Sequence, residues 1–385
     1  MNGKKVLVGI SGGVDSSVAA FILMEKGYYV EGLHIMNGFP NRGERDAQLA
    51  ATKLKIPLRK IDLTVEFKRE VVDYFISEYM AGRTPNPCIK CNREIKFKYL
   101  LKKAREWNFD YIATGHYARI ERDISENKLK LPATSCGESP TVKENVFRVR
   151  SLTPQQAAGN ALAVQFSLLK GVDRNKDQSY FLFFFGQEEL AKILFPNGDK
   201  TKGEIKRIAS QIGLESLAIK ESQEICFIPD NNYRNFIREN VKAVYPSPGN
   251  IIDREGNILG RHPGIHSFTI GQRRGLNISS THPYYVLEIN KEKNEVVVSR
   301  GDDLDLQGLT VKDVCWVSPD YPGREEIEAT VQIRYRHKGT LSRITTNRLD
   351  KRTYVKFINP EKAVAPGQAA VFYRGEQLLG GGWIE

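Results

Sequence analysis

The sequence predicts an α/β fold with a doubly wound parallel sheet, followed by two small β-rich domains, the last of them a β-barrel. Over the first 115 residues, short apolar runs alternate with amphipathic helical patterns, as in a parallel sheet covered by helices. A glycine-rich turn at residues 9–17 separates the first run from the first helical pattern. From residue 245 onward, short β-rich runs broken by Gly and Pro replace the helical patterns, which favours small barrels.

The apolar runs of the first part are expected to be buried parallel strands. They lie at residues 6–10, 29–35, 58–63 and 111–114. Helical patterns lie at residues 18–26, 44–54, 67–79 and 95–107. Ligands of such sheets bind at the carboxyl ends of the strands, so we expect residues 11–17 and 114–116 to meet at one edge.

The middle of the chain is less regular. The periodic pattern weakens at residues 121–166, and a Ser/Pro/Thr-rich stretch at 132–141 indicates a long surface insertion. Helical patterns resume at residues 187–194 and 202–212. The later β-rich runs lie at 249–259, 266–270, 284–289, 295–299, 330–333, 353–357 and 369–373. We therefore expect a catalytic domain at 1–229 with an insertion near 121–166, a central β-rich domain at 230–302 and a C-terminal barrel at 303–385.

Composition limits the class of protein. A chain of 385 residues with 41% hydrophobic content can bury sizeable cores and suggests two or three domains. The N-terminus holds no secretory apolar segment, and no stretch approaches transmembrane length, so we expect a cytoplasmic protein with no membrane partner. Five cysteines, an odd number, favour thiol chemistry or metal ligation over a disulfide framework.

The positive charge of the chain is concentrated in two windows. The net charge is +11, and residues 83–105 and 331–356 each hold eight Lys or Arg against one acidic residue. Aromatic residues are interleaved in both windows, at Phe97 and Tyr99 and at Tyr335 and Tyr354. Either window alone could be a solvated basic face, but the two together indicate a nucleic-acid partner.

The glycine-rich turn indicates a phosphate site. It reads Gly-Ile-Ser-Gly-Gly-Val-Asp-Ser-Ser between a predicted strand and a predicted helix, which directs backbone N–H groups and a helix N-terminus at one anion. The Lys-Ser/Thr ending of a Walker loop is absent, and Asp15 stands in the turn instead. We expect Asp15 to hold Mg²⁺ and Ser11, Ser16 and Ser17 to donate to phosphate oxygens. An ordinary capped Gly-Gly turn is the structural alternative.

Three cysteines are candidates for thiol chemistry. Cys88 and Cys91 follow two prolines that stiffen residues 84–92, and nearby Lys and Arg side chains at 90, 93 and 96 are expected to lower the thiol pKa. Cys226 lies far along the chain in an apolar run, where a buried hydrophobic role is the alternative. Cys315, between Val314 and Trp316, is expected to be a core residue.

A series of motifs gives a specific resemblance. SGGVDSS, TPNPCxxCNxxIKF, ATGHYAR, KDQSYFL, ESQEICFIP, FTIGQRRGL and PGQAAVFY occur in this order. SGGxDS after a first strand resembles the ATP pyrophosphatase (PP-loop) superfamily, and the whole series resembles the tRNA-specific 2-thiouridylase family (MnmA/TrmU). The resemblance covers nearly all of the chain except about residues 121–166. It implies transfer of sulfur to C2 of the wobble uridine, using ATP and Mg²⁺.

The resemblance also implies roles for individual residues. Cys226 would carry sulfur as a persulfide delivered by a cysteine desulfurase or a sulfur-relay protein, and Cys91 would be the nucleophile that releases it, with a transient disulfide between them. ATP would be bound by Gly9, Ile10, Ser11, Gly12, Gly13, Val14, Asp15, Ser16, Ile35 and Gly115. The tRNA anticodon stem-loop would be held by Asn86, Pro87, Cys88, His116, Lys176, Asp177, Gln178, Arg334, Tyr335 and Gln368.

Two positions depart from the family pattern. Many family members carry Asp where this chain has Cys88, and Gly where it has Glu224. Cys88, Cys91 and Cys226 therefore supply three thiolates, which would also suit an iron–sulfur cluster with one open iron. Persulfide relay and cluster-assisted sulfuration both remain open at the level of sequence.

Other functions share parts of this pattern. SGGVDS also fits argininosuccinate, asparagine, GMP, NAD and lysidine synthetases, which transfer an amine and need no cysteine pair. A non-catalytic tRNA-binding module with an ATP switch belongs to a different class. A zinc site at Cys88 and Cys91 would need a second nearby ligand pair.

Overall fold

The parallel sheet predicted for the first part of the chain is present in the structure. The computed structural model describes residues 3–39, 43–125, 163–218, 225–228, 230–241, 247–321, 326–347 and 352–385. Its first sheet has the order β3-β2-β1-β4-β7, and all neighbouring strands are parallel. The strands are β1 (Lys5–Gly9), β2 (Tyr29–Met36), β3 (Leu58–Asp62), β4 (Tyr111–Ala113) and β7 (Ile193–Leu194). The four predicted strands are confirmed.

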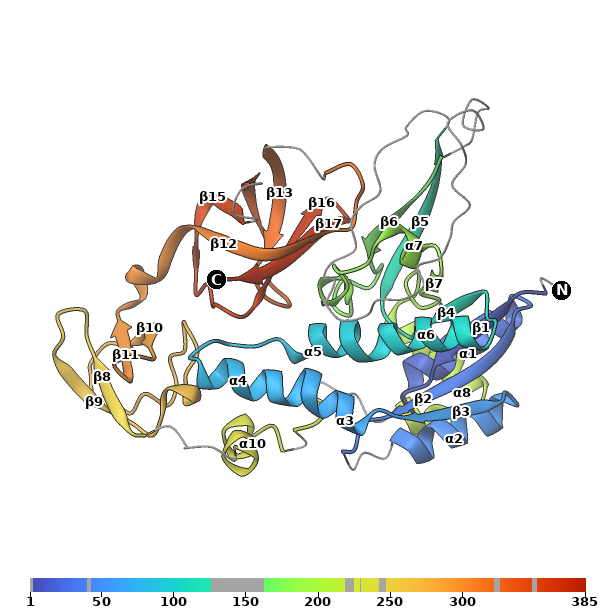
Figure 1. The fold of residues 1–385 in the computed structure, drawn as a ribbon, viewed down its shortest axis with the longest axis horizontal. Coiled ribbons are helices and arrows are strands. Elements are labelled where there is room, and N and C mark those ends of the chain that lie inside the picture. Colours follow the sequence, from blue (N-terminus) through green and yellow to red (C-terminus); the bar gives the residue numbers. More distant parts are fainter. Residues whose placement is uncertain are drawn as a thin grey trace.

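Helices cover both faces of this sheet, as the doubly wound prediction requires (Figure 1). On one face Leu7 and Ile112 pack with Leu100 of α6. On the other face Val6 and Val8 pack with helices on the opposite side. The helices are α1 (Val14–Glu25), α2 (Gly43–Leu54), α6 (Lys98–Glu106), α7 (Gln187–Leu190), α8 (Lys202–Gln211) and α9 (Glu215–Ala218). The pattern predicted as one helix at 187–194 is divided, because Ile193 and Leu194 pair with β4 as a fifth strand.

Two long helical segments lead from the sheet toward the β-rich part (Figure 1). The first consists of α3 (Thr64–Phe67), a π-helical turn (Lys68–Asp73) and α4 (Tyr74–Met80). The second consists of α5 (Pro87–Lys90), a π-helical turn (Cys91–Phe97) and α6. The predicted apolar face at Phe67, Val71, Phe75 and Tyr79 is buried, and it packs with Phe227 in one cluster. The short helix α10 (Tyr233–Asn240) completes this cluster.

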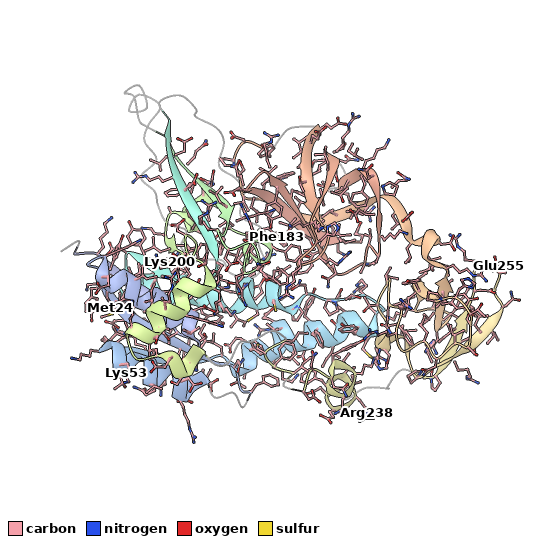
Figure 2. The ribbon with its side chains drawn as sticks, turned by 180° about the vertical axis from the view of Figure 1, so that it is seen from behind. Met24, Lys53, Phe183, Lys200, Arg238 and Glu255 are labelled. Atoms are coloured by element: carbon pink, nitrogen blue, oxygen red, sulfur yellow. The ribbon has the colours of Figure 1, made fainter. Side chains whose placement is uncertain are left out.

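A β-hairpin that the sequence did not reveal joins the catalytic part to the barrel. Strands β5 (Ala118–Ser125) and β6 (Ala163–Lys170) are antiparallel, and β6 pairs with β17. Residues 121–125 and 163–166 are therefore strands rather than irregular insertion. The rest of that insertion, with Cys136, lies outside the described residues. The Phe183 ring packs against Trp383 and the Gly381 backbone of β17. Figure 2, which views the molecule from behind, labels this residue.

Two further β structures follow, and the predicted fold class is confirmed. A four-stranded sheet of order β10-β11-β8-β9 holds β8 (Gly249–Ile252), β9 (Ile258–His262), β10 (Tyr285–Asn290) and β11 (Glu295–Ser299). A six-stranded barrel closes where β12 pairs with β17. Its strands are β12 (Asp305–Trp316), β13 (Glu326–Gln332), β14 (Thr340–Thr346), β15 (Thr353–Lys362), β16 (Ala369–Arg374) and β17 (Gln377–Ile384).

The β-rich predictions differ from the structure at residues 266–270 and at three strands that no predicted run covers, β12, β14 and β17. Residues 266–270 form no strand, because the chain makes a 3₁₀ turn at Ile265–Ser267. Strand β17 was missed because Gly380, Gly381 and Gly382 have low strand propensity. A Cβ at Gly380 would lie 2.4 Å from the Cys315 carbonyl oxygen, so close packing in the barrel requires glycine there. Within the described residues, no helix combines the length and apolar character needed to span a membrane.

Candidate active site

The glycine-rich loop between β1 and α1 is held together by its own serines. The Ser16 hydroxyl donates to the Gly13 carbonyl oxygen at 2.9 Å and accepts from the Ser11 N–H at 3.2 Å. Ser17 is fully buried and donates to the same carbonyl at 3.1 Å, so its hydroxyl does not face a ligand as expected. Gly13 is the N-cap of α1 and has no side chain to cap the helix. The first-turn N–H groups of α1 are therefore left for an anion.

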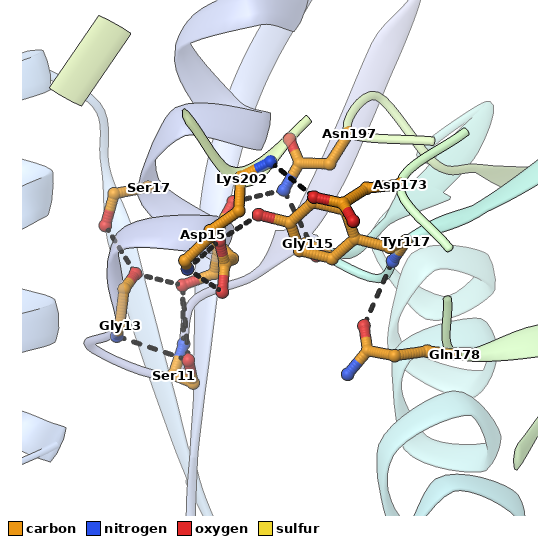
Figure 3. A network of polar contacts seen from close by, with 11 residues as sticks. Ser11, Gly13, Asp15, Ser17, Gly115, Tyr117, Asp173, Gln178, Asn197 and Lys202 are labelled. Atoms are coloured by element: carbon orange, nitrogen blue, oxygen red, sulfur yellow. Dashed lines mark hydrogen bonds and ion pairs between the residues drawn. The ribbon is translucent and has the colours of Figure 1, made fainter. Parts of the chain in front are cut away.

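Asp15 is the most contacted side chain of this loop. Lys202 Nζ lies 2.7 and 2.9 Å from its two carboxylate oxygens, and the Tyr117 hydroxyl donates to Oδ1 at 2.6 Å (Figure 3). Asn197 donates to the Asp15 carbonyl oxygen at 2.9 Å and to the Gly115 carbonyl oxygen at 3.1 Å. Mg²⁺ is usually held by one or two carboxylates together with substrate phosphates, so the Asp15 carboxylate suits this ion. Mg²⁺ and the Lys202 ammonium would compete for the same carboxylate oxygens.

Sequence reasoning missed Lys202, Tyr117 and Asn197. The one available signal was the Thr201-Lys-Gly-Glu204 capping box, which marks the start of α8 and so places Lys202 in its first turn. Nothing in the sequence alone indicated that α8 begins beside the glycine-rich loop.

Gly115 brings the ends of β1 and β4 into contact. A Cβ at this position would lie 2.5 Å from the Asp15 carbonyl carbon and 2.6 Å from the Ser16 nitrogen. Only a residue without a side chain allows this approach. The prediction that residues 11–17 and 114–116 meet at one sheet edge is confirmed.

A cavity of about 310 Å³ opens beside the loop. Its lining includes His34 and Met36 at the end of β2, together with Glu44 and Asp62. The His34 ring nitrogen Nδ1 lies 2.8 Å from the Ile10 carbonyl oxygen, which ties this cavity to the loop. Ile35 packs in the opposite direction, against the Phe67 cluster, because side chains alternate along a strand.

The three thiols come together from two distant segments. Pro87 begins α5, and the Asn86 side chain caps it by accepting from the Ile89 N–H at 3.4 Å. Phe227, next to Cys226, is buried between Phe67 and Phe75, which anchors that segment beside α5. Cys91 is buried, whereas solvent reaches Cys88 and Cys226.

A π-helical turn directs Lys96 at these thiols. In an α-helix, side chains five residues apart point about 140° from each other, whereas the wider π turn brings residue i+5 back over residue i. The turn Cys91–Phe97 thus places Lys96 on the Cys91 side of the helix. Lys96 interacts electrostatically with Cys88, Cys91 and Cys226 alike.

Comparisons with known proteins agree with this geometry. The family described as tRNA methyl transferase HUP domain matches residues 4–138 and 154–230, a PRC-barrel domain of the same family group matches 234–300, and an aminomethyltransferase beta-barrel domain matches 306–384. The tRNA-specific 2-thiouridylase MnmA 2 of Syntrophus aciditrophicus is 43% identical over 92% of this chain and 98% of its own length. The MnmA proteins of Geobacter metallireducens and Geotalea uraniireducens are 40% and 42% identical over 99% of this chain and 97% and 95% of their own lengths. The chain belongs to the tRNA-specific 2-thiouridylase family.

The thiol pKa values differ from the sequence prediction in sign. The surrounding protein raises the pKa of Cys91 to about 12, and it raises the pKa of Cys88 and of Cys226 as well, while Lys96 opposes the shift. Lys90 lies over the rings of Tyr74 and Trp383, 5.0 and 5.8 Å from their centroids, and it contributes no such effect. In this member of the thiouridylase family, the buried Cys91 is therefore held as a thiol at neutral pH.

His116 is buried beside Phe97 and interacts with Lys96. Its ring is buried, lies 5.5 Å from the Phe97 ring centroid and places Nδ1 2.7 Å from the Thr114 hydroxyl. Burial, with repulsion from Lys96, lowers the pKa of His116 to about 3. His116 is thus neutral at pH 7 and follows Gly115 directly in the chain.

The residues that the resemblance assigns to tRNA lie in separate places. The Asp177 carboxylate accepts from the Gly171 and Ser179 N–H groups at 2.9 and 3.1 Å, and burial raises its pKa. Gln178 accepts from the Tyr117 N–H at 3.0 Å, and Lys176 stands in the same turn. In the barrel, Tyr335 packs on Phe181 with ring centroids 4.6 Å apart, and Arg334 donates to the Lys362 carbonyl oxygen. Gln368 contacts the loop before α5.

An iron–sulfur cluster is not supported by the arrangement of the side chains. Among the parts of the chain that the structure describes, no group of three or more His, Cys, Asp and Glu side chains is arranged to hold a metal ion. The three thiols are close enough to interact but do not form a ready-made cluster site.

The contact at Gly115 gives a first prediction. Gly115→Ala should displace the first turn of α1 and weaken ATP binding by about tenfold or more, because the new Cβ overlaps backbone atoms. Gly203→Ala in α8 is the control, since its Cβ would have Thr201 Oγ1 at 3.9 Å as its one near neighbour. Isothermal titration with ATP and Mg²⁺ measures both affinities. Equal affinities in the two variants would contradict the account.

Lys96 gives a second prediction. Lys96→Met should raise the pH at which Cys88 alkylation by iodoacetamide is half-maximal, because the ammonium that lowers the thiol pKa is lost. Lys90→Met is the control, since the Lys90 ammonium faces aromatic rings. Mass spectrometry of the Cys88 peptide across pH gives the midpoints. A midpoint in Lys96→Met equal to or below that of the wild type would refute the assignment.

Proposed function

We propose that this chain is an ATP-dependent tRNA sulfurtransferase that converts the wobble uridine to 2-thiouridine. The observation that carries the proposal is the sheet edge where Gly115 lies against the nucleotide loop and the next residue, His116, interacts with Lys96, which also interacts with the three thiols. A site that can activate an oxygen with a nucleotide and a site that can supply sulfur are thereby adjacent. The relatives at 40–43% identity carry the name of the same activity.

ATP makes the uracil oxygen a leaving group. The phosphates would lie on the glycine-rich loop and the first turn of α1, and the cavity beside His34 is large enough to receive part of the nucleoside. The C2 oxygen of uridine attacks the α-phosphorus, the bond to the β-phosphate oxygen breaks, and pyrophosphate leaves. Asp15 would hold Mg²⁺, which supplies charge neutralisation to the phosphates. Lys202 at the same carboxylate adds a positive charge beside the loop.

Sulfur then replaces the activated oxygen. The terminal sulfur of a persulfide on Cys226 attacks C2, and the oxygen departs with AMP. The Cys91 thiolate next attacks Cys226 Sγ, so that the S–S bond breaks and the outer sulfur stays on C2. The product is 2-thiouridine together with a Cys91–Cys226 disulfide, which an external thiol must reduce before the next turnover. A cysteine desulfurase or a sulfur-relay protein would supply the persulfide sulfur.

The tRNA would reach this edge by presenting a flipped base. The C2 oxygen is inaccessible in a stacked anticodon, so the uridine must leave the stack. Asn86, Pro87, Cys88 and His116 would surround the base. The domain at 230–302, the barrel at 303–385 and the basic windows would contact the RNA backbone, through residues such as Lys176 and Arg334. A cytoplasmic location fits this partner.

Two alternatives remain distinguishable from the persulfide route. Cluster-assisted sulfuration would use Cys88, Cys91 and Cys226 as iron ligands, although the described side chains are not arranged for one. Amine transfer, as in other PP-loop synthetases, would not need Cys91 or Cys226. The close approach of three thiols favours sulfur transfer over amine transfer.

The decisive experiment is nucleoside mass spectrometry of unmodified tRNA after incubation with enzyme, ATP, Mg²⁺ and a persulfide donor. Enzyme purified in air, without visible absorbance, should form 2-thiouridine, whereas Cys91→Ser and Cys226→Ser should form none above about a hundredth of the wild-type yield. Activity found only after anaerobic reconstitution, with visible absorbance, would establish the cluster route. No 2-thiouridine under either condition would refute the proposed function.

A further inference from the structure

The C-terminal barrel is hydrogen-bonded to the loop that leads into α5. The turn at residues 363–368, between β15 and β16, lies against the segment that precedes Cys88 (Figure 1). The Thr84 N–H donates to the Pro366 carbonyl oxygen at 2.8 Å. The Gln368 side-chain nitrogen donates to the Thr84 and Pro85 carbonyl oxygens at 3.0 and 3.1 Å. These partners are more than 280 residues apart in the chain.

The approach is so close that it requires glycine. Gly367 has φ +88°, and a Cβ there would lie 2.9 Å from the Thr84 carbonyl oxygen and 3.1 Å from Arg83 Cβ. In a second contact, Trp383 of β17 packs against Tyr74 of α4 and Lys90 of α5. The barrel therefore contacts both the loop before α5 and Lys90, the last residue of α5.

The loop needs this outside support because it has few hydrogen bonds of its own. Pro85 and Pro87 lack an N–H group, so they cannot donate to a neighbouring carbonyl. The Thr84 and Pro85 carbonyl oxygens accept from Gln368 instead. Asn86 and Cys88 follow within three residues, so any shift of Thr84 and Pro85 moves the Asn86 cap of α5 and the Cys88 thiol.

We propose that Gln368 and Gly367 are positioning residues of the thiolation reaction, acting through Thr84 and Pro85 on the loop that carries Asn86 and Cys88. This inference rests on the proposed function. Both hydrogens of the Gln368 amide nitrogen are engaged by the loop, so the residue acts on the rate of the reaction more than on the affinity for tRNA. The resemblance assigns Gln368 to tRNA contact. A tRNA contact would act on the affinity for tRNA more than on the rate of the reaction.

Two pairs of variants isolate the contact. Gln368→Ala removes two hydrogen bonds to the loop, and Gln377→Ala removes one from the same barrel to Ser167, away from the loop. Gly367→Ala places a Cβ against Thr84, whereas Gly375→Ala, at φ +58°, meets nothing within 4 Å. Each control thus has the same chemistry as its partner and lacks the loop contact.

Single-turnover thiolation at saturating tRNA, with tRNA affinity measured in parallel, gives the test. Gln368→Ala and Gly367→Ala should lower the single-turnover rate about 10- to 100-fold, because small displacements of positioned groups have effects of this size. Their Kd for tRNA should stay within about twofold of the wild type, and both controls should keep the wild-type rate. A weaker Kd with an unchanged saturated rate would make Gln368 a tRNA contact and overturn the proposal. Rates equal to those of the controls would overturn it as well.

A second measurement separates this inference from the proposed function. The alkylation rate of Cys88 by iodoacetamide, without tRNA or ATP, should change in Gln368→Ala and Gly367→Ala and stay at the wild-type value in the two controls. If wild-type enzyme forms no 2-thiouridine, the proposed function fails, and this rate still reports whether the barrel positions the loop. An alkylation rate that is the same in all five proteins would refute the positioning role.

Discussion

The approach of Gly115 to the first turn of α1 is the constraint on which the site depends. No side chain fits between Gly115 and the Asp15–Ser16 backbone, so the end of β4 is fixed against the nucleotide loop. His116, the next residue, packs on Phe97 and faces Lys96. One short segment thereby sets the separation between a phosphate site and a thiol cluster. Two half-reactions can share one substrate atom only if that separation is fixed.

The nucleotide loop and the thiol cluster differ in their electrostatics. The nucleotide loop gathers positive charge, through helix α1 and Lys202, where an anionic substrate is expected. Burial instead raises the pKa of the Cys91 thiol and keeps it protonated at pH 7, and Lys96 partly offsets that effect. A protonated thiol is a poor nucleophile and a poor target for oxidants, so the cysteines gain reactivity only when sulfur is loaded or a proton is removed. The barrel completes the arrangement by holding the loop before Cys88.

Local patterns in the sequence predicted much of this molecule, and contacts between distant segments account for most of what was missed. The strands at 6–10 and 111–114 and the glycine-rich loop follow from apolar runs and turn residues, which act over short distances. The sign of the thiol pKa shift was wrong, because a count of nearby cations ignores burial and the direction of Lys90. Lys202 and the hairpin β5–β6 were missed because tertiary pairing with Asp15 and with β17 leaves no periodic signal.

The central claim is that nucleotide and thiol act in turn on one uracil oxygen at this sheet edge. The most direct measurement uses tRNA labelled with ¹⁸O at C2 of the wobble uridine, with mass spectrometry of the released AMP after one turnover. The account predicts that the label is found in AMP, because the oxygen departs bonded to the α-phosphorus. Label found in water, with unlabelled AMP and normal formation of 2-thiouridine, would contradict it.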